Sequence, residues 1–286
     1  MGSKLERFKI VQDSGNILTV ELSGFPKELV NALRRIAMAE VPVMAIDEVL
    51  FTENTSSLYN EYIAHRLGLL PLKTQGEPET LAQVSLDIQS GSSLPERVDF
   101  QLRAEGPSGS EKSTTVTAGN LKPMGDAAEI EPVYSDVPLF RLGRGQVVEF
   151  QAFARYGIGK QHAKFSPVSP ATYTFKPVII FDKSKDFNCE EHVLVCPKNC
   201  LEYKNQELVF TDPWECILCK ACEKDCKSGA TKISWDESTV RLTIESTGSL
   251  PARVIFKTAL LILMKKLELA QKLLSRKLTV EEVHSQ

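Results

Sequence analysis

Residues 251–277 read PARVIFKTALLILMKKLELAQKLLSRK and carry the clearest secondary-structure pattern in the chain. Apolar side chains recur at alternating steps of four and three residues, the spacing at which side chains share one face of an α-helix. Ser249 and Pro251 suit a helix beginning, so we expect one helix from there to about Lys277. The apolar seam consists of Phe256, Leu260, Leu263, Leu267, Ala270 and Leu274.

A second apolar face lies beside this seam. It carries Ile255, Ala259, Ile262, Leu269 and Leu273. If one face packs against the helix's own domain, the other is left for a different surface. The pattern fits a core helix that its own domain covers and a dimerisation helix equally well, and periodicity does not choose between them.

The N-terminal segment predicts a hairpin followed by a short amphipathic helix. Residues 4–22 contain two strand-like runs, FKIV and ILTVEL, on either side of a turn. The helix that follows begins near Pro26 and ends before Pro42. Its apolar positions are Leu29, Leu33 and Ile36.

Residues 46–170 predict a mainly β domain, because short alternating runs are separated by Gly, Ser and Pro clusters. Examples of these runs are VSLDI, VDFQLRA and VVEFQAFARYG. The strand-like TYTFKPVIIF then leads into a cysteine-rich segment. After that segment, TKISWD and VRLTIES predict a pair of strands.

Composition excludes several classes of protein. The net charge of −3 shows no basic excess, so we expect no direct sequence-specific binding of nucleic acid. The longest apolar run, Thr258–Met264, is too short to span a bilayer, and the N-terminus lacks the apolar core of a signal peptide. We therefore expect a cytoplasmic protein with no membrane association.

All seven cysteines lie between Cys189 and Cys226, which favours metal ligands in a reducing compartment over disulfides. The spacing C-x2-C-x2-C-x3-C over residues 216–226 is that of bacterial-type ferredoxins, in which three close thiolates and one from another run hold an iron–sulfur cluster. A shift of 30 residues aligns Cys196 with Cys226 and reveals a two-fold repeat. The complete predicted site consists of Cys196, Cys216, Cys219 and Cys222.

The other copy of the repeat has lost two of its three leading cysteines. A degraded second site would consist of Asp186, Cys189, His192 and Cys226. Four thiolates predict one [4Fe-4S] cluster, and the spacing leaves a [3Fe-4S] form open. One alternative is structural zinc on Cys196, Cys200, Cys216 and Cys219. In another, the metal is lost, and Cys189, Cys200 and Cys226 pair or stay free.

Two classes of function fit a cluster of this kind. A ferredoxin-like electron-transfer protein or oxidoreductase subunit would use it as a relay, but the chain has no dinucleotide or flavin signature. A structural protein would use it to fold an insert with little core of its own, because metal-binding free energy becomes folding free energy. No run of carboxylates suits two-metal nucleotidyl transfer, and no nucleophile elbow or phosphate loop is present, so we expect no catalytic residues.

Three stretches carry a resemblance to a known family. They are NALRRIAMAEVPVMAIDEVLF (31–51), NEYIAHRLGLLPL (60–72) and GIGKQHAKFSPVSPATYTFKP (157–177). They resemble the family of archaeal RNA polymerase D subunits, the counterparts of the bacterial alpha subunit and of the eukaryotic third-largest polymerase subunit. With the cysteine segment and the C-terminal helix, the similarity covers nearly the whole chain.

The resemblance implies an α+β fold in which a discontinuous, RNA polymerase alpha-like dimerisation domain carries two insertions. The three parts of the dimerisation domain would be residues 1–45, 171–186 and 229–286, the last of which holds the C-terminal helix. The insertions would be a β-rich domain at 46–170 and a ferredoxin-like iron–sulfur domain at 187–228.

The resemblance also implies partners and a non-catalytic role in a nucleotidyltransferase complex that carries out transcription. Family members pair with the smaller subunit L, and the pair is the platform for the large catalytic subunits and the small subunits N and P. The implied dimer interface consists of Leu29, Leu33, Ile36, Phe256, Leu260, Leu263 and Leu267. The implied large-subunit contacts are Arg34, Arg35, Arg66, Lys160, His162, Lys164 and Phe165; without the resemblance, the arginines would be read as solvated charges.

Overall fold

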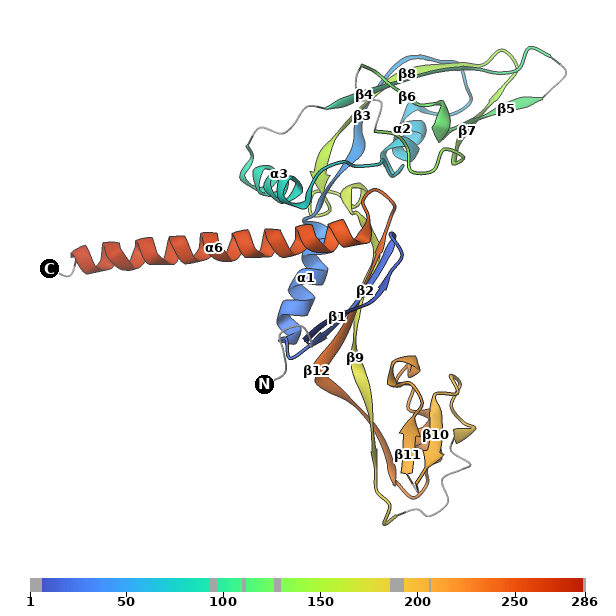
Figure 1. The fold of residues 1–286 in the computed structure, drawn as a ribbon. Helices are drawn as coiled ribbons and strands as arrows, with labels where there is room; N and C mark the ends of the chain where they lie inside the picture. Colours follow the sequence, from blue (N-terminus) through green and yellow to red (C-terminus); the bar gives the residue numbers. More distant parts are fainter. Residues whose placement is uncertain are drawn as a thin grey trace. The chain divides into compact units, whose positions relative to one another are not determined.

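The computed structural model of the chain describes residues 7–92, 97–109, 112–125, 130–185, 193–205 and 207–284. Contacts divide the chain into two compact units, each assembled from segments that lie far apart in the sequence. Unit 1 consists of Met1–Val11, Thr19–Asn31 and Thr172–Leu242, and unit 2 of Gln12–Leu18, Ala32–Ala171 and Thr243–Gln286. The described residues contain both helices and strands (Figure 1), which agrees with the predicted mixture of α and β structure.

A four-stranded sheet with the order β1-β2-β12-β9 combines strands from the beginning, middle and end of the chain. The strands are β1 (Phe8–Asp13), β2 (Ile17–Ser23), β9 (Val168–Phe181) and β12 (Thr231–Ser246). β1 and β2 confirm the predicted N-terminal hairpin. Leu18, Val20 and Leu22 of β2 are buried, as their alternation predicts.

β12 corrects one prediction. TKISWD and VRLTIES are not two strands but the two halves of this single strand. The residues between the two halves are typical of turns. Inside the strand their polar groups are hydrogen-bonded, because the carboxylate of Asp236 accepts hydrogen bonds from the Ser238 amide (2.8 Å) and hydroxyl (2.6 Å). Glu237 forms an ion pair with Lys27 (2.9 Å). The polar interruption therefore leaves the backbone extended.

The two predicted helices are confirmed as α1 (Lys27–Ala39) and α6 (Ala252–His284), and α6 continues beyond the predicted end at Lys277. α6 begins where the amide of Ala252 donates to the carbonyl of Gly15 (2.8 Å). Further along, the ammonium group of Lys266 forms an ion pair with Glu40. No helix in the described residues is both long enough and apolar enough to cross a membrane.

Unit 2 contains an antiparallel sheet with the order β3-β8-β4-β6 and the separate pair β5-β7. The strands are β3 (Pro42–Asn54), β4 (Val98–Glu105), β5 (Ser113–Thr117), β6 (Lys122–Pro123), β7 (Pro138–Gly143) and β8 (Val147–Ile158). The helices are α2 (Asn60–Gly68), α3 (Pro78–Ser90) and the 3-10 turns η2 (Ala118–Asn120) and η3 (Ala163–Phe165). Ile63 and Leu67 of α2 pack with Phe100 and Phe150 in the core of this unit.

α3 corrects a second prediction, because VSLDI lies inside this helix and not in a strand. Pro78 occupies the first turn and Gly91 ends the helix with φ 73°, a conformation that glycine adopts without strain. The buried residues Leu81 and Ser85 lie one turn apart, and the Ser85 hydroxyl donates to the carbonyl of Glu40 (2.6 Å). The alternation in VSLDI is too short to show this helical period.

The cysteine-rich segment belongs to unit 1 and contains little regular structure. Its elements are the hairpin β10 (Leu201–Lys204) and β11 (Glu207–Phe210), the 3-10 turn η4 (Pro213–Glu215) and the one-turn helix α5 (Ala221–Asp225). Among the described residues, the core cluster of this segment and the adjoining strand β12 contains four buried residues. They are Leu201, Leu208, Cys222 and Ile233.

One close contact in unit 2 requires a glycine. Phe165 of η3 is buried against β8, and a Cβ atom on Gly157 would lie 2.6 Å from the Phe165 ring carbons. The ring also lies 5.0 Å from the Arg155 guanidinium carbon and 5.1 Å from the Lys164 nitrogen. Phe165 therefore anchors η3 and the charged side chains around it to the sheet.

We predict that Gly157→Ala lowers the free energy of unfolding by about 1–3 kcal/mol, because the added methyl group forces the ring of Phe165 to move. Thermal or urea unfolding measures the effect. Gly109→Ala is the control, because a Cβ atom there meets nothing within 4 Å. Equal stability of the two variants would contradict this packing.

Candidate thiolate pocket and apolar helix face

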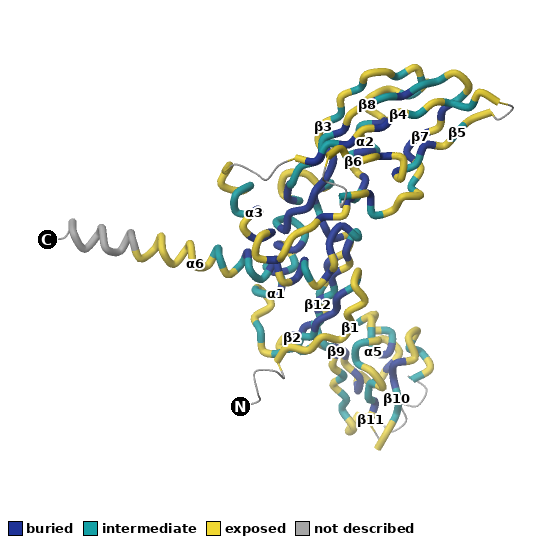
Figure 2. Tube along the Cα trace, turned by 45° about the horizontal axis from the view of Figure 1, so that its top comes forward, coloured by how far each residue is buried: buried dark blue, intermediate teal, exposed yellow. Residues whose placement is uncertain are grey.

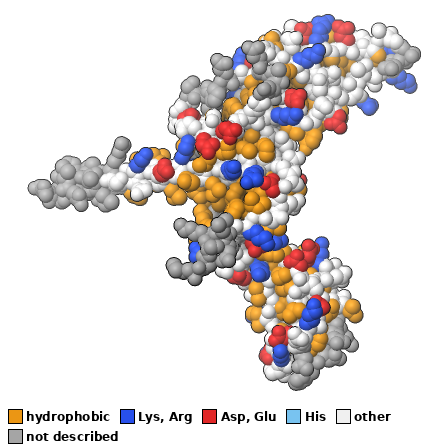
Figure 3. All heavy atoms as spheres, in the orientation of Figure 1, with side chains coloured by type: hydrophobic (Ala, Val, Ile, Leu, Met, Phe, Trp, Pro, Cys, Tyr) orange, Lys and Arg blue, Asp and Glu red, His pale blue; other side chains and the backbone are white. Residues whose placement is uncertain are grey.

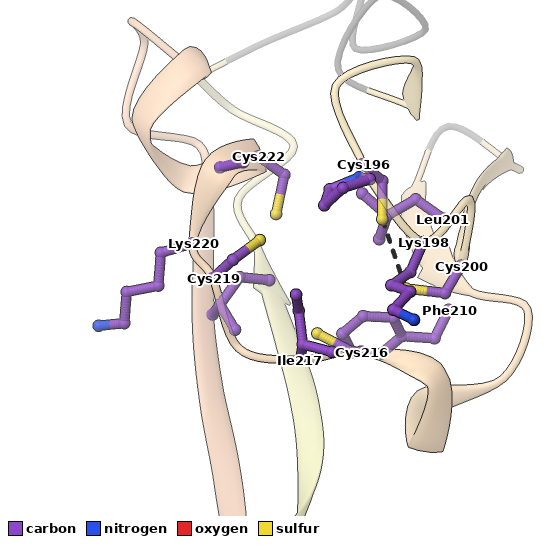
Figure 4. A pocket seen from close by; sticks show the side chains of 13 residues that line it. Cys196, Lys198, Cys200, Leu201, Phe210, Cys216, Ile217, Cys219, Lys220 and Cys222 are labelled. Carbon is purple, nitrogen blue, oxygen red and sulfur yellow. Dashed lines mark hydrogen bonds between the residues drawn. The ribbon is translucent and has the colours of Figure 1, made fainter. Parts of the chain in front are cut away.

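Five cysteines line one cavity in unit 1, which measures about 320 Å³ including the part open to solvent. Four of them are the predicted ligands Cys196, Cys216, Cys219 and Cys222, and the fifth is Cys200. Figure 4 shows the sulfur atoms of Cys219 and Cys222 on one side of this cavity and those of Cys196 and Cys200 on the other. The structure thus brings together the four residues that the spacing and the repeat select.

The backbone around this thiolate pocket adopts a conformation that is rare outside glycine. Asn199, Leu218 and Lys220 have φ values of 50°, 54° and 59°. Leu218 and Lys220 flank Cys219, and the Leu218 amide donates to the Cys216 sulfur (3.4 Å). Loops with such left-handed residues turn amide N–H groups toward one concave side, which suits anions such as phosphates and iron–sulfur clusters.

The thiols of the pocket differ in acidity. Burial would raise the pKa of Cys196, but hydrogen bonds from the amides of Cys200 and Lys198 bring it below its ordinary value. Burial, together with the hydrogen bond to Cys196, raises the pKa of Cys200 to about 12. Burial also raises the pKa of Cys222. Cys196 is therefore the more readily ionised member of the pair whose sulfur atoms lie 3.5 Å apart.

The iron–sulfur scheme from the sequence gives Cys200 no role, yet this residue lies at the pocket. The repeat gives no signal for it, because the 30-residue shift selects Cys196 alone from this run. Cys226 is buried outside the pocket lining, with its sulfur 3.2 Å from the Ser228 hydroxyl. The other members of the predicted second site, Asp186, Cys189 and His192, lie outside the described residues.

The spacing of the sulfur atoms bears on the kind of metal group that fits. Within the described ranges, no three Cys, His, Asp or Glu side chains converge closely enough to hold a single ion. A zinc ion needs four ligand atoms at about 2.0–2.3 Å, whereas an iron–sulfur cluster is larger and its thiolates bind different iron atoms.

The C-terminal helix α6 carries an apolar stripe that the chain covers only in part. Figure 2 shows that α6 changes along its length from buried to exposed. In its first half, Ile255, Ala259 and Ile262 have no exposed surface. In its second half, each apolar side chain from Met264 onward that the structure describes is largely exposed. The large ones are Met264, Leu267, Leu269, Leu273 and Leu274, between 54% and 64% exposed.

The residues of the implied dimer interface differ in the same way. Leu33, Ile36 and Phe256 are buried within the chain, and Leu29, Leu260 and Leu263 are partly buried. Leu267 is 61% exposed. The space-filling view shows hydrophobic side chains along α6 and over α1 (Figure 3).

The match to known proteins extends over nearly all of this structure. Residues 19–267, which include α1, the thiolate pocket and half of α6, match the RNA polymerase Rpb3/Rpb11 dimerisation domain. The chain belongs to the Rpb3/Rpb11 family. This confirms the alpha-like dimerisation fold over most of the chain and the resemblance at the level of the family.

Relatives in this family come from archaea and eukaryotes. The chain is 33% identical to the DNA-directed RNA polymerase subunit Rpo3 of Pyrobaculum arsenaticum, over 92% of this chain and 94% of the relative. It is 35% identical to Rpo3 of Pyrococcus horikoshii, over 91% and 94%. It is 32% identical to the DNA-directed RNA polymerase II subunit rpb3 of Dictyostelium discoideum, over 92% of both. None of these names supports the electron-transfer alternative.

The polar residues implied as large-subunit contacts have varied environments in this Rpb3/Rpb11-family chain. Arg35, Lys160 and His162 are exposed. Arg34 and Arg66 are partly buried and donate to the carbonyls of Ala171 (3.4 Å) and Pro138 (2.6 Å). Phe165 is 1% exposed and Lys164 is largely buried, so these two residues have structural contacts within the chain.

Lys164 belongs to a compact ionic cluster that the sequence did not reveal. Asp47 lies 2.5 Å from the Lys164 nitrogen and 2.6 Å from Arg155 Nε. Burial would raise the pKa of the Asp47 carboxyl, but the hydrogen bonds and charges of Lys164 and Arg155 hold it below its usual value. The cluster connects β3, β8 and η3, so it holds the segment 162–165 in place.

We predict that Asp47→Asn lowers the free energy of unfolding at pH 7 by about 1–3 kcal/mol, because it leaves a largely buried lysine without a counter-ion. The pKa of Asp47 is depressed in the folded chain, so its contribution is complete above the unfolded pKa of about 3.9 and disappears as pH falls through the lower folded value. Urea unfolding of the wild type and of Asp47→Asn between pH 7 and pH 3 should therefore show a difference in the free energy of unfolding that becomes smaller as the pH falls.

The control for this prediction is Glu237→Gln, which removes the exposed ion pair with Lys27. Exposed pairs contribute little, so this variant should unfold like the wild type. A difference between Asp47→Asn and wild type that grows as the pH falls would contradict the role given to the cluster.

Proposed function

We propose that this chain is a non-catalytic assembly subunit of a DNA-directed RNA polymerase, the counterpart of the archaeal D subunit. The family match over residues 19–267 and relatives named as polymerase subunits support this function. The chain pairs with a smaller, Rpb11-like partner, subunit L in archaea. The pair is then the platform for the large catalytic subunits and for the small subunits N and P.

The observation that carries the pairing is the uncovered part of the α6 stripe. Phe256, Leu260 and Leu263 lie on the same side of the helix as Leu267 and Leu274, because their positions differ by nearly whole numbers of turns. The stripe is thus continuous, but the chain covers only its beginning. Burial of a leucine side chain contributes about 1.5–3 kcal/mol, so a partner helix on the uncovered part gains most of its binding energy there.

We expect the double variant Leu267→Asp/Leu274→Asp to weaken binding of the Rpb11-like partner at least about 100-fold, because it removes two apolar contacts and places two carboxylates in an apolar interface. Co-expression followed by size-exclusion chromatography, and titration of the separate chains, measure the effect. Both residues are more than 60% exposed in the chain itself, so its own stability should change little.

Lys272→Asp provides the matched control. This residue is exposed on the same turns of α6 but lies on its polar side, and its substitution changes the net charge by the same amount as the double variant. It should bind the partner like the wild type. Equal binding by the leucine variant and the control would remove the support that α6 gives to the pairing.

Within this subunit, we propose that Cys196, Cys216, Cys219 and Cys222 hold one iron–sulfur cluster. A [4Fe-4S] cluster uses all four thiolates, and a [3Fe-4S] cluster and zinc are the alternatives. The shared cavity, the left-handed backbone at Leu218 and the ferredoxin-like spacing of the cysteines support the cluster. In the zinc alternative, Cys200 replaces Cys222, and the short distance between the sulfurs of Cys196 and Cys200 supports that pair.

The role of the metal group is structural. The core cluster that the structure describes here contains four buried residues, of which one is a predicted ligand and another belongs to β12, so apolar burial alone gives the segment little stability. Metal binding then supplies folding free energy to this segment. The absence of catalytic residues of its own stays a prediction from the sequence.

We expect Cys222→Ser to lose most of its iron and acid-labile sulfide, and Cys200→Ser to keep both. The two side chains are similarly buried, at 8% and 2% exposure, so a general packing defect would affect both variants. Absorbance spectra with iron, sulfide and zinc analysis of chains purified without oxygen measure the outcome. The opposite pattern, with zinc lost from Cys200→Ser alone, would contradict the cluster and support zinc. Both variants should still bind the Rpb11-like partner, because α6 lies outside the cysteine-rich segment.

A further inference from the structure

A second cavity of unit 1 lies between two strands that belong to different sheets. Its lining comes mainly from β9 and β11, and it encloses about 770 Å³ including the part open to solvent. The lining residues from the strands are Pro177, Val178, Ile179, Phe181, Glu207, Leu208, Val209 and Phe210. Figure 1 shows the end of β9 and the hairpin β10–β11 in the same region of unit 1.

The lining shows that the cavity meets both strands at their edges. Successive residues of a strand point to opposite faces of its sheet. A cavity that touches only a face would therefore be lined by every second residue. Here four consecutive residues of β11 and three consecutive residues of β9, 177–179, contribute to the lining. The groove is thus bounded by two strand edges, and we call it the edge groove.

Neither of these edges has a partner strand among the described residues. β11 pairs with β10 and with no further strand, and β9 is the last strand of its sheet. Between β11 and β10, the N–H group of Thr211 donates to the carbonyl of Cys200 (3.0 Å). Along an antiparallel strand, residues whose backbone N–H and C=O groups face the partner strand alternate with residues whose groups face away from it. The N–H groups of Leu208 and Phe210 therefore point away from β10, toward the edge groove.

β9 shows the same arrangement. The Asp182 amide, which follows β9, donates to the Ala230 carbonyl before β12 (2.9 Å), so residues 180 and 178 face β12 and residues 179 and 177 face outward. Pro177 has no N–H group, and proline within a strand is tolerated where its nitrogen faces away from the ladder. Its position confirms that this side of β9 is an edge.

The side chains that line the edge groove are apolar, apart from one charged side chain at its rim. That side chain, Glu207, is already paired with Lys183 (2.8 Å). Exposed strand edges usually carry lysine or other charges that prevent pairing with further strands, but residues 177–181 read PVIIF. Val178 and Ile180 leave 36% and 54% of their surfaces exposed.

We propose that the edge groove binds an extended polypeptide segment as an added β-strand. The occupant is a segment of another polymerase subunit with apolar side chains at alternate positions, about four or five residues long to match β11. Its backbone hydrogen bonds with the outward-facing groups of β11 and β9, and its apolar side chains contact Val178 and Phe210. This proposal rests on the proposed function, because the occupant belongs to the assembled polymerase.

Amide hydrogen exchange tests the edge groove in the purified pair of this chain with its Rpb11-like partner and in polymerase reconstituted from purified subunits. The amides of Ile179, Leu208 and Phe210 should exchange at least about tenfold more slowly in the polymerase than in the pair. Fast exchange in both would overturn the proposal, as would slow exchange in both. Protection that increases with the concentration of the pair alone would assign the groove to a second copy and overturn the proposed occupant.

A pair of matched variants provides the second test. Val178→Asp places a carboxylate in the edge groove, whereas Ile180→Asp places one on an exposed position of the same strand that does not line the groove. We expect Val178→Asp to weaken incorporation of the pair into polymerase at least about tenfold and Ile180→Asp to leave it unchanged. Equal behaviour of the two variants would contradict the groove.

Pairing with the Rpb11-like partner is measured separately for both variants. A wild-type chain that does not pair, or does not enter the polymerase, would overturn the proposed function itself. A wild-type chain that enters the polymerase while its edge-groove amides stay fast would overturn only the strand addition.

Discussion

In the part of α6 whose side chains the structure describes, the apolar residues from Met264 onward form a surface that the other described residues do not cover. An apolar stripe of this length is costly in water, because each exposed leucine forgoes roughly 1.5–3 kcal/mol of burial free energy. The chain itself covers Phe256 and, in part, Leu260 and Leu263, but the described residues from Leu267 to Ser275 stay exposed. In the proposed function, the stripe connects a folded core with the surface that binds the Rpb11-like partner.

The segments that precede α6 in the sequence supply the support for its buried half. In unit 2, Glu40 pairs with Lys266, and the Glu40 carbonyl accepts from Ser85 of α3. Asp47 connects β3 to Arg155 and Lys164, and Gly157 leaves room for Phe165. These contacts are short and specific, and they fix the signature stretches 31–51 and 157–177 against one another.

The cysteine-rich segment follows a different physical principle. Its core is small, and left-handed backbone at Asn199, Leu218 and Lys220 brings its thiols around one cavity. In the proposed structure, a metal group replaces the apolar core that such a short segment lacks. Among the described residues, the outer edges of β9 and β11 have no partner strand. In the two proposals, this part of the chain therefore binds a metal group inside and an added β-strand at its edge.

The sequence by itself determined α1, the N-terminal hairpin, α6 and the set of four predicted ligands, because helical period, strand alternation and cysteine spacing are local properties. It failed where the pattern was short or polar: VSLDI is part of α3, and the polar residues at Asp236 do not end β12. Only the tertiary structure decided which part of the α6 stripe is covered, that Cys200 joins the pocket while Cys226 does not, and that Asp47 meets Lys164. These outcomes depend on contacts between residues far apart in the chain, and no local pattern records which apolar or charged side chain the fold brings next to another.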